Sequence, residues 1–241
     1  MAASLLLGDC LELLEDVEDK SVDMVLCDLP YGTTRCKWDT PIDLVALWKA
    51  YDRVCKPSAA ICLFAQTPFD KVLGCSNLPD LRYEWIWEKG EATGHLNSNK
   101  MPLKAHENVL IFYKQLPTYN PQKTSGHERK QSKKTTDSTE LYGKQGVGLQ
   151  MEYNSTDRFP RSVQKFSKDK QSINLHPTQK PLALCEYLIK TYTNEGETIL
   201  DNCFGSGTTG LAAINTGRNF IGMEKDETFY KLARARLGLA Q

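Results

Sequence analysis

The stretch TILDNCFGSGTTGLAAINTGRNFIGME, from Thr198 to Glu224, predicts a strand, a glycine-rich turn, a helix and a second strand. The first strand is a short apolar run that ends on Asp201 and Asn202, and the second strand ends on Glu224. The expected elements are a strand at Thr198–Leu200, a helix at Thr208–Asn215 and a strand at Phe220–Met223. This order is typical of a βαβ unit in a parallel sheet.

The turn of this unit has the chemistry of a nucleotide site. Gly205, Gly207 and Gly210 have the spacing G-x-G-x-x-G, and Glu224 lies 19 residues beyond Gly205. Glycines let a ligand approach the backbone, the helix N-terminus offers N–H groups, and the acid can hold ribose hydroxyls. The alternative is a tight strand-to-helix turn with no ligand.

The position of this unit in the chain limits the fold. Only 31 residues follow Gly210, which is enough for one helix, one strand and one more helix. Because two parallel strands cannot stand alone, the other strands must come from earlier in the chain. We therefore expect a sheet whose parts arrive in permuted order.

The composition indicates a real core and a local concentration of positive charge. The chain has 241 residues, 40% of them hydrophobic, and a net charge of zero. Residues 114–170 hold 12 Lys and Arg against 6 Asp and Glu, a net charge of +6. This distribution suggests an anionic partner for the middle of the chain, and the alternative is a solvated loop.

The cysteines and the N-terminus point to a cytosolic protein. None of the eight cysteines forms a C-x-x-C pair, so we expect buried, reduced thiols and no zinc site. The start of the chain turns acidic at once and lacks the basic region of a signal peptide. No apolar stretch approaches membrane-spanning length, so no membrane partner is expected.

The first 113 residues alternate strands and helices, as a doubly wound α/β sheet does. A polar loop at residues 90–108 is expected between the last two strands. The predicted strands are Ser4–Leu7, Val22–Cys27, Ala59–Phe64, Tyr83–Trp87 and Val109–Tyr113, and the predicted helices are Cys10–Val17, Leu44–Cys55 and Pro68–Cys75.

Regular periodicity fails from Lys114 to Asn174, where prolines and glycines are scattered among basic and aromatic residues. A structureless loop of this length is improbable in a compact domain, so the region is an inserted subdomain or a segment that orders on a partner. A helix opened by Pro181 then leads to the nucleotide turn. If the strands that end at Asp28 and Asp201 are neighbours, their polar tips face each other at the carboxyl edge of the sheet.

Several short segments together resemble one family. Asp28-Leu29-Pro30-Tyr31 resembles the D-P-P-Y tetrapeptide of methyltransferases that modify adenine N6 or cytosine N4 in DNA, and residues 202–207 are similar to their F-x-G-x-G turn. Gly8-Asp9-Cys10 and the H-P-T-Q-K-P segment at 176–181 also match. The order, with the tetrapeptide first and the turn last, is similar to the β-class, whose Rossmann-like methyltransferase sheet is circularly permuted.

The resemblance implies three parts of the chain. Residues 1–113 would be the catalytic half, 114–174 a variable target-recognition region, and 175–241 the cofactor-binding half of the same domain. The one departure is Leu29, where proline is usual. Because the family uses the backbone carbonyl of this residue, which leucine also has, the chemistry remains available.

The resemblance also implies a catalytic set and a cofactor. Asp28 and a carbonyl near Leu29 or Pro30 would accept the two amine hydrogens of the target base, and Tyr31 would stack on the flipped base. The cofactor would be S-adenosylmethionine, with Glu224 on its ribose and Asp9 on its adenine edge. Its remaining contacts are expected among Cys10, Thr178, Lys180, Asp201, Phe204, Gly205, Ser206, Gly207 and Thr208. For Asp9 a helix N-cap, and for Lys180 a solvated helix start, are the structural alternatives.

The partner implied by the resemblance is double-stranded DNA in a bacterial or phage setting. Phosphate contacts are expected from Lys133, Lys134, Arg158, Arg161 and Lys165, although any exposed basic residue has the same appearance. A homodimer and a cognate restriction endonuclease are further partners that the family allows.

Adenine N6 is the favoured target, with cytosine N4 as the alternative that the aspartate of the tetrapeptide disfavours. A nicotinamide-dinucleotide oxidoreductase fits the glycine turn literally, but the chain ends too soon after it. A nucleic-acid-binding protein with an inactive methyltransferase fold predicts damaged motifs, whereas Asp28, Tyr31, Gly205 and Gly207 are intact. An RNA or protein methyltransferase would more naturally carry asparagine in place of Asp28.

Overall fold

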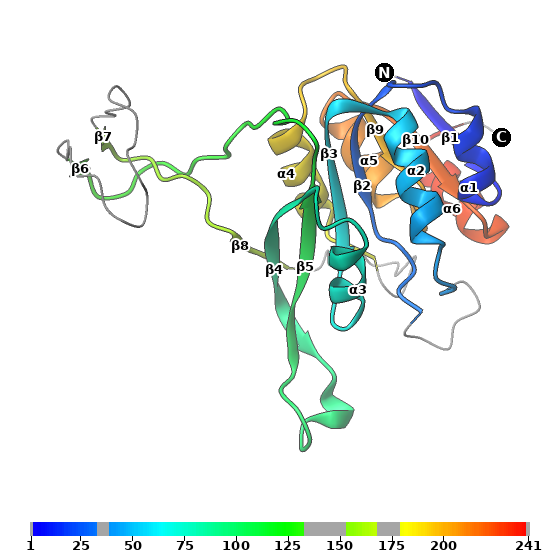
Figure 1. The fold of residues 1–241 in the computed structure, drawn as a ribbon. Coiled ribbons are helices and arrows are strands. Elements are labelled where there is room, and N and C mark those ends of the chain that lie inside the picture. Colours follow the sequence, from blue (N-terminus) through cyan, green and yellow to red (C-terminus); the bar gives the residue numbers. More distant parts are fainter. Residues whose placement is uncertain (1, 33–38, 133–152, 168–178, 240–241) are drawn as a thin grey trace. The chain divides into compact units, whose positions relative to one another are not determined.

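A computed structural model describes residues 2–32, 39–132, 153–167 and 179–239 of the chain (Figure 1). The chain divides into two compact units. The main unit comprises residues 1–120 and 162–241, and the smaller unit is Pro121–Arg161. The predicted target-recognition region, 114–174, therefore includes residues at both of its ends that belong to the main unit.

Among the described residues, the main unit contains an eight-stranded sheet in the order β1-β10-β9-β2-β3-β5-β4-β8. The strands are β1 (Ala3–Leu7), β2 (Val22–Cys27), β3 (Cys55–Ala65), β4 (Leu81–Thr93), β5 (Lys104–Phe112), β8 (Val163–Phe166), β9 (Thr198–Asp201) and β10 (Asn219–Glu224). The strands β1, β10, β9, β2 and β3 are parallel, and β5 runs antiparallel to both β3 and β4.

The order of the strands confirms the predicted permuted α/β sheet. β9 pairs with β2, with Met24 opposite Ile199 and Val25 opposite Leu200. These two strands are neighbours in the sheet although they are far apart in the chain. From this pair the chain winds outward in both directions, to β3 on one side and to β10 on the other. The carboxyl ends of β2 and β9 therefore meet at the topological switch point, where α/β sheets bind ligands.

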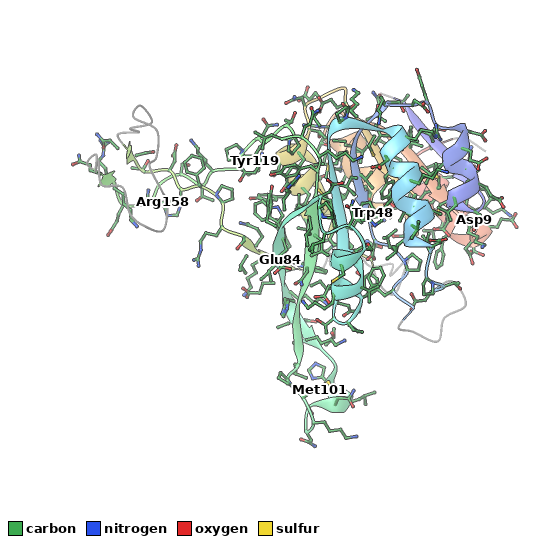
Figure 2. All side chains as sticks on the ribbon, viewed as in Figure 1. Asp9, Trp48, Glu84, Met101, Tyr119 and Arg158 are labelled. Atoms are coloured by element: carbon green, nitrogen blue, oxygen red, sulfur yellow. The ribbon has the colours of Figure 1, made fainter. Side chains whose placement is uncertain are left out.

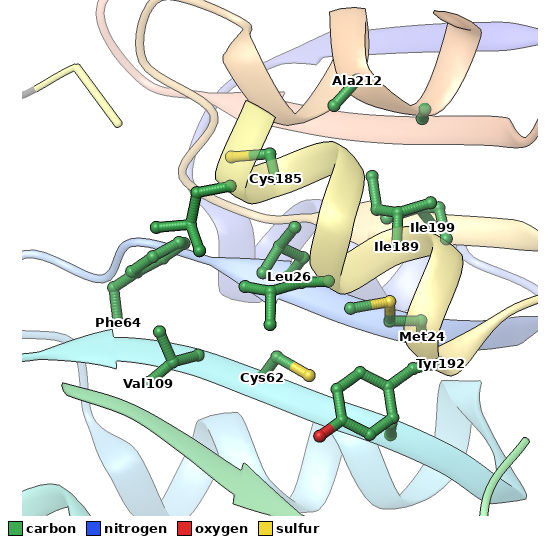
Figure 3. Close-up of a cluster of buried hydrophobic side chains, with 14 of the residues drawn as sticks. Met24, Leu26, Cys62, Phe64, Val109, Cys185, Ile189, Tyr192, Ile199 and Ala212 are labelled. Atoms are coloured by element: carbon green, nitrogen blue, oxygen red, sulfur yellow. The ribbon is translucent and has the colours of Figure 1, made fainter. Parts of the chain in front are cut away.

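Helices cover both faces of this sheet because its central strands are apolar on both sides. α4 (Leu182–Tyr192), α5 (Thr208–Asn215) and α6 (Glu227–Arg236) pack on one face, and α1 (Cys10–Leu13), α2 (Leu44–Val54) and α3 (Phe69–Ser76) pack on the other. Figure 3 shows Cys185 and Ile189 of α4 above Leu26 and Met24 of β2. No helix among the described residues has the length and apolar character needed to cross a bilayer.

Aspartates begin three of these helices. Asp9, Asp43 and Asp226 each accept hydrogen bonds from backbone N–H groups of the first turn that follows. The helix predicted at Cys10–Val17 is shorter than expected, because α1 gives way to a 3-10 turn, η1 (Leu14–Asp16). The helix predicted at Thr208–Asn215 is confirmed as α5.

The predicted polar loop at 90–108 is wrong at both of its ends. Residues up to Thr93 continue β4, and β5 already begins at Lys104, so the two strands form a long hairpin around η2 (His95–Asn97). Polar residues occupy these strands because cross-strand pairing satisfies their backbone groups without requiring a buried face. β8, which was also not predicted, pairs in parallel with β4.

In the smaller unit, β6 (Lys130–Ser132) and β7 (Tyr153–Ser155) form an antiparallel pair. A bridge between Thr124 and Arg158 adds to it. The Lys123 ammonium lies 4.4 Å from the centre of the Phe159 ring, a cation–π contact.

All seven described cysteines are free thiols. Five are buried as expected, but Cys203 is half-buried and Cys75 is exposed. Cys36 lies outside the described residues.

Candidate active site

A cavity of about 570 Å³ lies at the carboxyl edge of the sheet. Both polar strand tips line it: Asp28 to Tyr31 after β2, and Asp201 to Ser206 after β9. Residues at or just after the ends of β1 and β10, among them Asp9, Cys10 and Glu224, complete the wall. The expected meeting of the two strand tips is thus confirmed.

Both carboxylate oxygens of Asp28 have partners. Oδ1 accepts a hydrogen bond from the Tyr31 hydroxyl at 2.8 Å, and Oδ2 lies 2.5 Å from the Lys180 ammonium. The Asp28 side chain retains 26% of its exposure, so it faces the cavity while it is held from behind. Each oxygen still has a lone pair to offer, because a carboxylate has about four acceptor sites.

Lys180 belongs to a buried network of alternating charges. Its Nζ lies 3.3 Å from Glu107 Oε2, and Glu107 Oε1 lies 2.6 Å from the ammonium of Lys89. Burial alone would lower the pKa of Lys180, but the carboxylates of Asp28 and Glu107 outweigh it and raise that pKa. Burial would raise the pKa of Glu107, but Lys180 and Lys89 outweigh it and lower that pKa. Lys180 and Glu107 are therefore both charged at neutral pH, and the network combines two acids with two bases.

Tyr31 is a partly covered aromatic platform. Its ring stacks on Phe69 of α3, with centroids 5.0 Å apart and an angle of 22° between the planes. Burial, and then the charge of Asp28, raise the pKa of the Tyr31 phenol well above its ordinary value. The hydroxyl is therefore a neutral donor to Asp28.

The glycine turn after β9 is shaped by backbone geometry and by packing. Gly205 and Gly207 have φ of +51° and +77°, in the left-handed region that favours glycine. A Cβ on Gly207 would lie 2.9 Å from Ala233 Cβ, and one on Gly210 would lie 2.7 Å from Phe220 Cε1. Gly207 and Gly210 thus permit close packing. Gly207 was predicted to contact the cofactor, but it is not among the residues that line the cavity.

Glu224 closes the turn from the neighbouring strand. Its carboxylate accepts hydrogen bonds from Gly205 N and Asp226 N, each at 2.8 Å. Burial raises its pKa despite these bonds. The side chain is therefore fixed at the cavity wall, at the tip of β10, where the sequence predicts a contact to ribose.

Asp9 is the helix N-cap that the sequence left open, and its contact to the adenine edge stays a prediction. Its Oδ1 caps α1 by accepting from Leu11 N at 3.0 Å, and the residue also lines the cavity. Next to it, hydrogen bonds among neighbouring thiols, and then burial, act on Cys10 and Cys203, and the net effect raises the pKa of both thiols. Asp201 is buried beneath the turn, and burial raises its pKa to about 6.

The described wall of the cavity is strongly acidic. Lys180 and Lys225 are its only basic residues, and both pair with acids, Asp28 and Asp9 respectively. Its acids are Asp9, Asp28, Asp39, Asp43, Asp201, Glu224 and Asp226. Such a wall favours a cationic ligand and opposes the pyrophosphate of a dinucleotide.

The structure places the remaining predicted residues as follows. Leu29, Pro30, Phe204, Ser206 and Thr208 line the cavity together with Lys180. Thr178, Lys133 and Lys134 lie outside the described residues. The H-P-T part of the segment before Lys180 is likewise outside them.

The predicted phosphate contacts have different surroundings. The Arg158 guanidinium donates to the backbone carbonyls of Ser155, Asp157 and Glu128, so it holds the chain of the smaller unit. Lys165 is exposed and pairs with Glu88 at 2.9 Å, and Arg161 is exposed. A role for these residues on DNA stays a prediction.

Sequence reasoning missed Glu107 and Phe69, which support Asp28 and Tyr31 from outside the recognised segments. Lys89, the other partner of Glu107, is buried on β4. Phe229 on α6 also lines the cavity. The sequence does contain a signal for it, because it is an apolar residue in the helix that directly follows the acidic end of β10.

Comparison with known proteins gives relatives of the same architecture. The DNA methylase family model, which describes N6 and N4 methyltransferases, matches residues 22–235. The Type II methyltransferase M1.MboII of Moraxella bovis is 26% identical over 93% of this chain and 92% of its own length. M2.DpnII of Streptococcus pneumoniae is 42% identical over 90 residues, which are 37% of this chain and 31% of that protein.

Two solved structures share the fold. The M1.HpyAVI–SAM complex has a TM-score of 0.65 at 23% identity and covers 98% of this chain and 100% of that one. The cytosine-N4-specific PvuII DNA methyltransferase has a TM-score of 0.72 at 17% identity and covers 98% of this chain and 86% of its own.

A permuted α/β sheet with an acid-lined cavity at its switch point places the protein among the Rossmann-like α/β folds. The chain belongs to the DNA methylase family of N6 and N4 methyltransferases, and it is a DNA methyltransferase.

Proposed function

We propose that this enzyme transfers a methyl group from S-adenosylmethionine to N6 of an adenine that is flipped out of duplex DNA. The observation that carries the proposal is the single cavity on which Asp28 to Tyr31 and the glycine turn both open. A base that approaches Asp28 and a cofactor that lies along the turn would then meet in one space.

The residues present fit this cofactor. When bound, S-adenosylmethionine supplies an electrophilic methyl group on a positively charged sulfur. The acidic wall suits its sulfonium and ammonium charges, and Glu224 stands at the strand tip where a ribose would be held. Asp9 and Cys10 would face the adenine edge, and Asp201, Phe204 and Gly205 the methionine end.

The chain's own groups explain how a weak nucleophile is activated. The lone pair of an exocyclic amine is delocalised into the ring, and acceptors for its two hydrogens make the nitrogen more tetrahedral. Asp28 would accept one hydrogen, and the carbonyl of Leu29 or Pro30 the other. Because Asp28 is already anionic, it stabilises the positive charge that develops on the nitrogen.

The network behind Asp28 keeps this arrangement in place. Lys180 and the Tyr31 hydroxyl hold both carboxylate oxygens, so the side chain need not reorganise when the base arrives. The ring of Tyr31, backed by Phe69, offers a stacking surface to the flipped base.

Cytosine N4 is the second candidate, because the family model covers N6 and N4 methyltransferases alike. The PvuII enzyme, whose structure is described as cytosine-N4-specific, shares this fold with a TM-score of 0.72. At 17% identity the likeness concerns the fold alone. The aspartate at position 28 is our reason for preferring adenine.

The test is direct. Methylation-free duplex DNA is incubated with the protein and S-adenosylmethionine, digested to nucleosides and analysed by mass spectrometry. We expect N6-methyladenine, whereas N4-methylcytosine would correct the base and no methylated nucleoside would refute the proposal.

Two variants assign the chemistry. Asp28→Ala should abolish turnover and leave cofactor binding, measured by calorimetry, largely intact. Glu18→Ala, which removes an exposed acid that does not line the cavity, is the matched control and should keep both. Loss of cofactor affinity in Asp28→Ala would contradict the division of roles.

A further inference from the structure

The hairpin of β4 and β5 extends past the end of its neighbour β3. β3 ends at Ala65, which pairs with Asn108, while the hairpin goes on through the pair Glu88–His106 to Thr93–Lys104. Because β4 has the same direction as β3, this extension leaves the sheet at its carboxyl edge, the edge that holds Asp28. Figure 1 shows the projection, and Figure 2 places Met101 at its far end. We call residues 90–104 the arm.

The tip of the arm presents bare apolar side chains. Leu96 is 100% exposed, Met101 51% and Leu103 36%. A leucine with no cover at all, on the most distant part of a projection, contributes nothing to the core. Exposed apolar residues gathered at one place mark an interaction site more often than scattered ones do.

The charges of the arm complement an anionic partner. Lys100 and Lys104 are both exposed, and Glu91 is the one acid among residues 90–104. Lys100 immediately precedes Met101, and Lys104 follows Leu103, so each cation stands beside an apolar side chain. Nucleic acid offers this combination of phosphates and stacked apolar rings.

The base of the arm is connected to the candidate catalytic carboxylate, Asp28, by a chain of ion pairs. Lys89 of β4 and Glu107 of β5 form a buried ion pair across the hairpin, at 2.6 Å. Glu107 in turn contacts Lys180, which contacts Asp28. The arm and the candidate catalytic carboxylate therefore share one rigid support, so a duplex that the arm holds is in register with the cavity.

We propose that the arm is a wedge that enters duplex DNA beside the target base and holds the base pair open. Leu96 and Met101 enter the base stack, and Lys100 and Lys104 bind the flanking phosphates. The proposal rests on the proposed function, because it concerns how the target base of that reaction leaves the helix.

The dimensions of the arm suit this role. The six residues from Lys89 to Gly94 extend about 20 Å at the usual rise of a strand. The major groove is about 12 Å wide and about 8.5 Å deep, and it admits a two-stranded ribbon. Leucine and methionine are among the side chains that DNA-bending proteins insert between base steps.

The test compares two substrates that differ only in how firmly the target is paired. The recognition sequence is first identified from the sites that the enzyme methylates in natural DNA. One substrate is an unmethylated duplex with this sequence, and the other is the same duplex with an abasic site opposite the target base. The variant is Leu96→Ser with Met101→Ser. The matched control is Val45→Ser with Leu78→Ser, which removes two other exposed apolar side chains.

We expect kcat/KM of the arm variant to fall about tenfold to a hundredfold on the paired duplex, and to stay within about threefold of wild type opposite the abasic site. The control should be unchanged on both. An equal loss on both substrates, or no loss on either, would overturn the wedge.

Binding gives a second readout that does not depend on turnover. Lys100→Gln with Lys104→Gln should reduce the slope of log K against log salt by about 2, because each phosphate contact contributes about 0.9. An unchanged slope would overturn the phosphate contacts. If the wild-type protein methylated no DNA while this slope still changed, the proposed reaction would fail and the DNA contact of the arm would stand.

Discussion

Replacement of Lys180 by methionine tests whether the buried network supports the catalytic carboxylate. Lys180 keeps 8% of its side-chain exposure and touches two carboxylates, those of Asp28 and Glu107. In the variant Glu107 retains Lys89, whereas Asp28 loses its only cationic contact among the described residues. Removal of one partner from a buried ion pair costs about 3–5 kcal/mol. Because Asp28 faces the cavity and can recover water, we expect a loss of about 2–3 kcal/mol.

The matched control is a lysine that forms a similar Lys–Asp ion pair at the surface of the protein. Lys56 lies 2.6 Å from Asp23, and its side chain is 44% exposed. Replacement of Lys56 by methionine should cost less than about 1 kcal/mol, because water screens exposed pairs. Urea unfolding at pH 7.5 gives both values. Equal losses in the two variants would refute the reasoning, because it attributes the larger loss to the burial of the Lys180 network.

The pH dependence of this loss has a definite sign. The pKa of Lys180 is raised, so its stabilising charge is complete below the ordinary value of 10.5 and is lost only above it. The pKa of Glu107 is lowered, so its contribution is complete above 4.5 and is lost as the pH falls through its lower value in the folded protein. The deficit of Lys180→Met should therefore be constant between pH 6 and 9, and unfolding curves across that range check it.

Three further predictions concern the turn and the strand beside it. The pKa of Asp201 is raised from 3.8 to about 6, so the wild-type fold loses stability as the pH rises through that window, and Asp201→Asn should be more stable above it by about 3 kcal/mol in urea unfolding. Gly210→Ala should cost about 1–3 kcal/mol because its Cβ would lie 2.7 Å from a ring carbon; the control Gly74→Ala, whose Cβ meets nothing nearer than 3.5 Å, should be neutral or slightly stabilising by the same assay. Tyr51→Phe should lower the free energy of unfolding in urea by about 1–3 kcal/mol. The change leaves Asn202 Oδ1 without the buried hydroxyl that donates to it at 2.5 Å.

The elements that could be predicted from sequence are those in which local pattern and tertiary burial agree. β2 matches its apolar run from Val22 to Cys27, because a central parallel strand is buried on both faces. α5 begins after Gly207, where the turn chemistry fixes the start of a helix. Asp28 and Asp201 were expected to meet, because the ends of neighbouring parallel strands share one edge.

The parts that could not be predicted depend on partners that are distant in the chain. The outer half of β4 is polar and exposed, so only its pairing with β5 identifies it as a strand. β8 is four residues long and has no informative period. The contacts of Lys180 with Asp28 and Glu107 join residues 152 and 73 positions apart, and no local signal identifies such a pair.

The electrostatics of the cavity explain why DNA contacts must lie elsewhere on this chain. A wall of carboxylates attracts a sulfonium but repels phosphates, and exposed charges act over about 8–10 Å before salt screens them. A duplex can therefore deliver a neutral base to Asp28 only if cations beyond this distance hold its backbone. The arm carries two described cations, Lys100 and Lys104, past the carboxyl edge. The separation of an acidic cavity from a basic arm follows from a reaction that joins a cationic donor to a polyanionic acceptor.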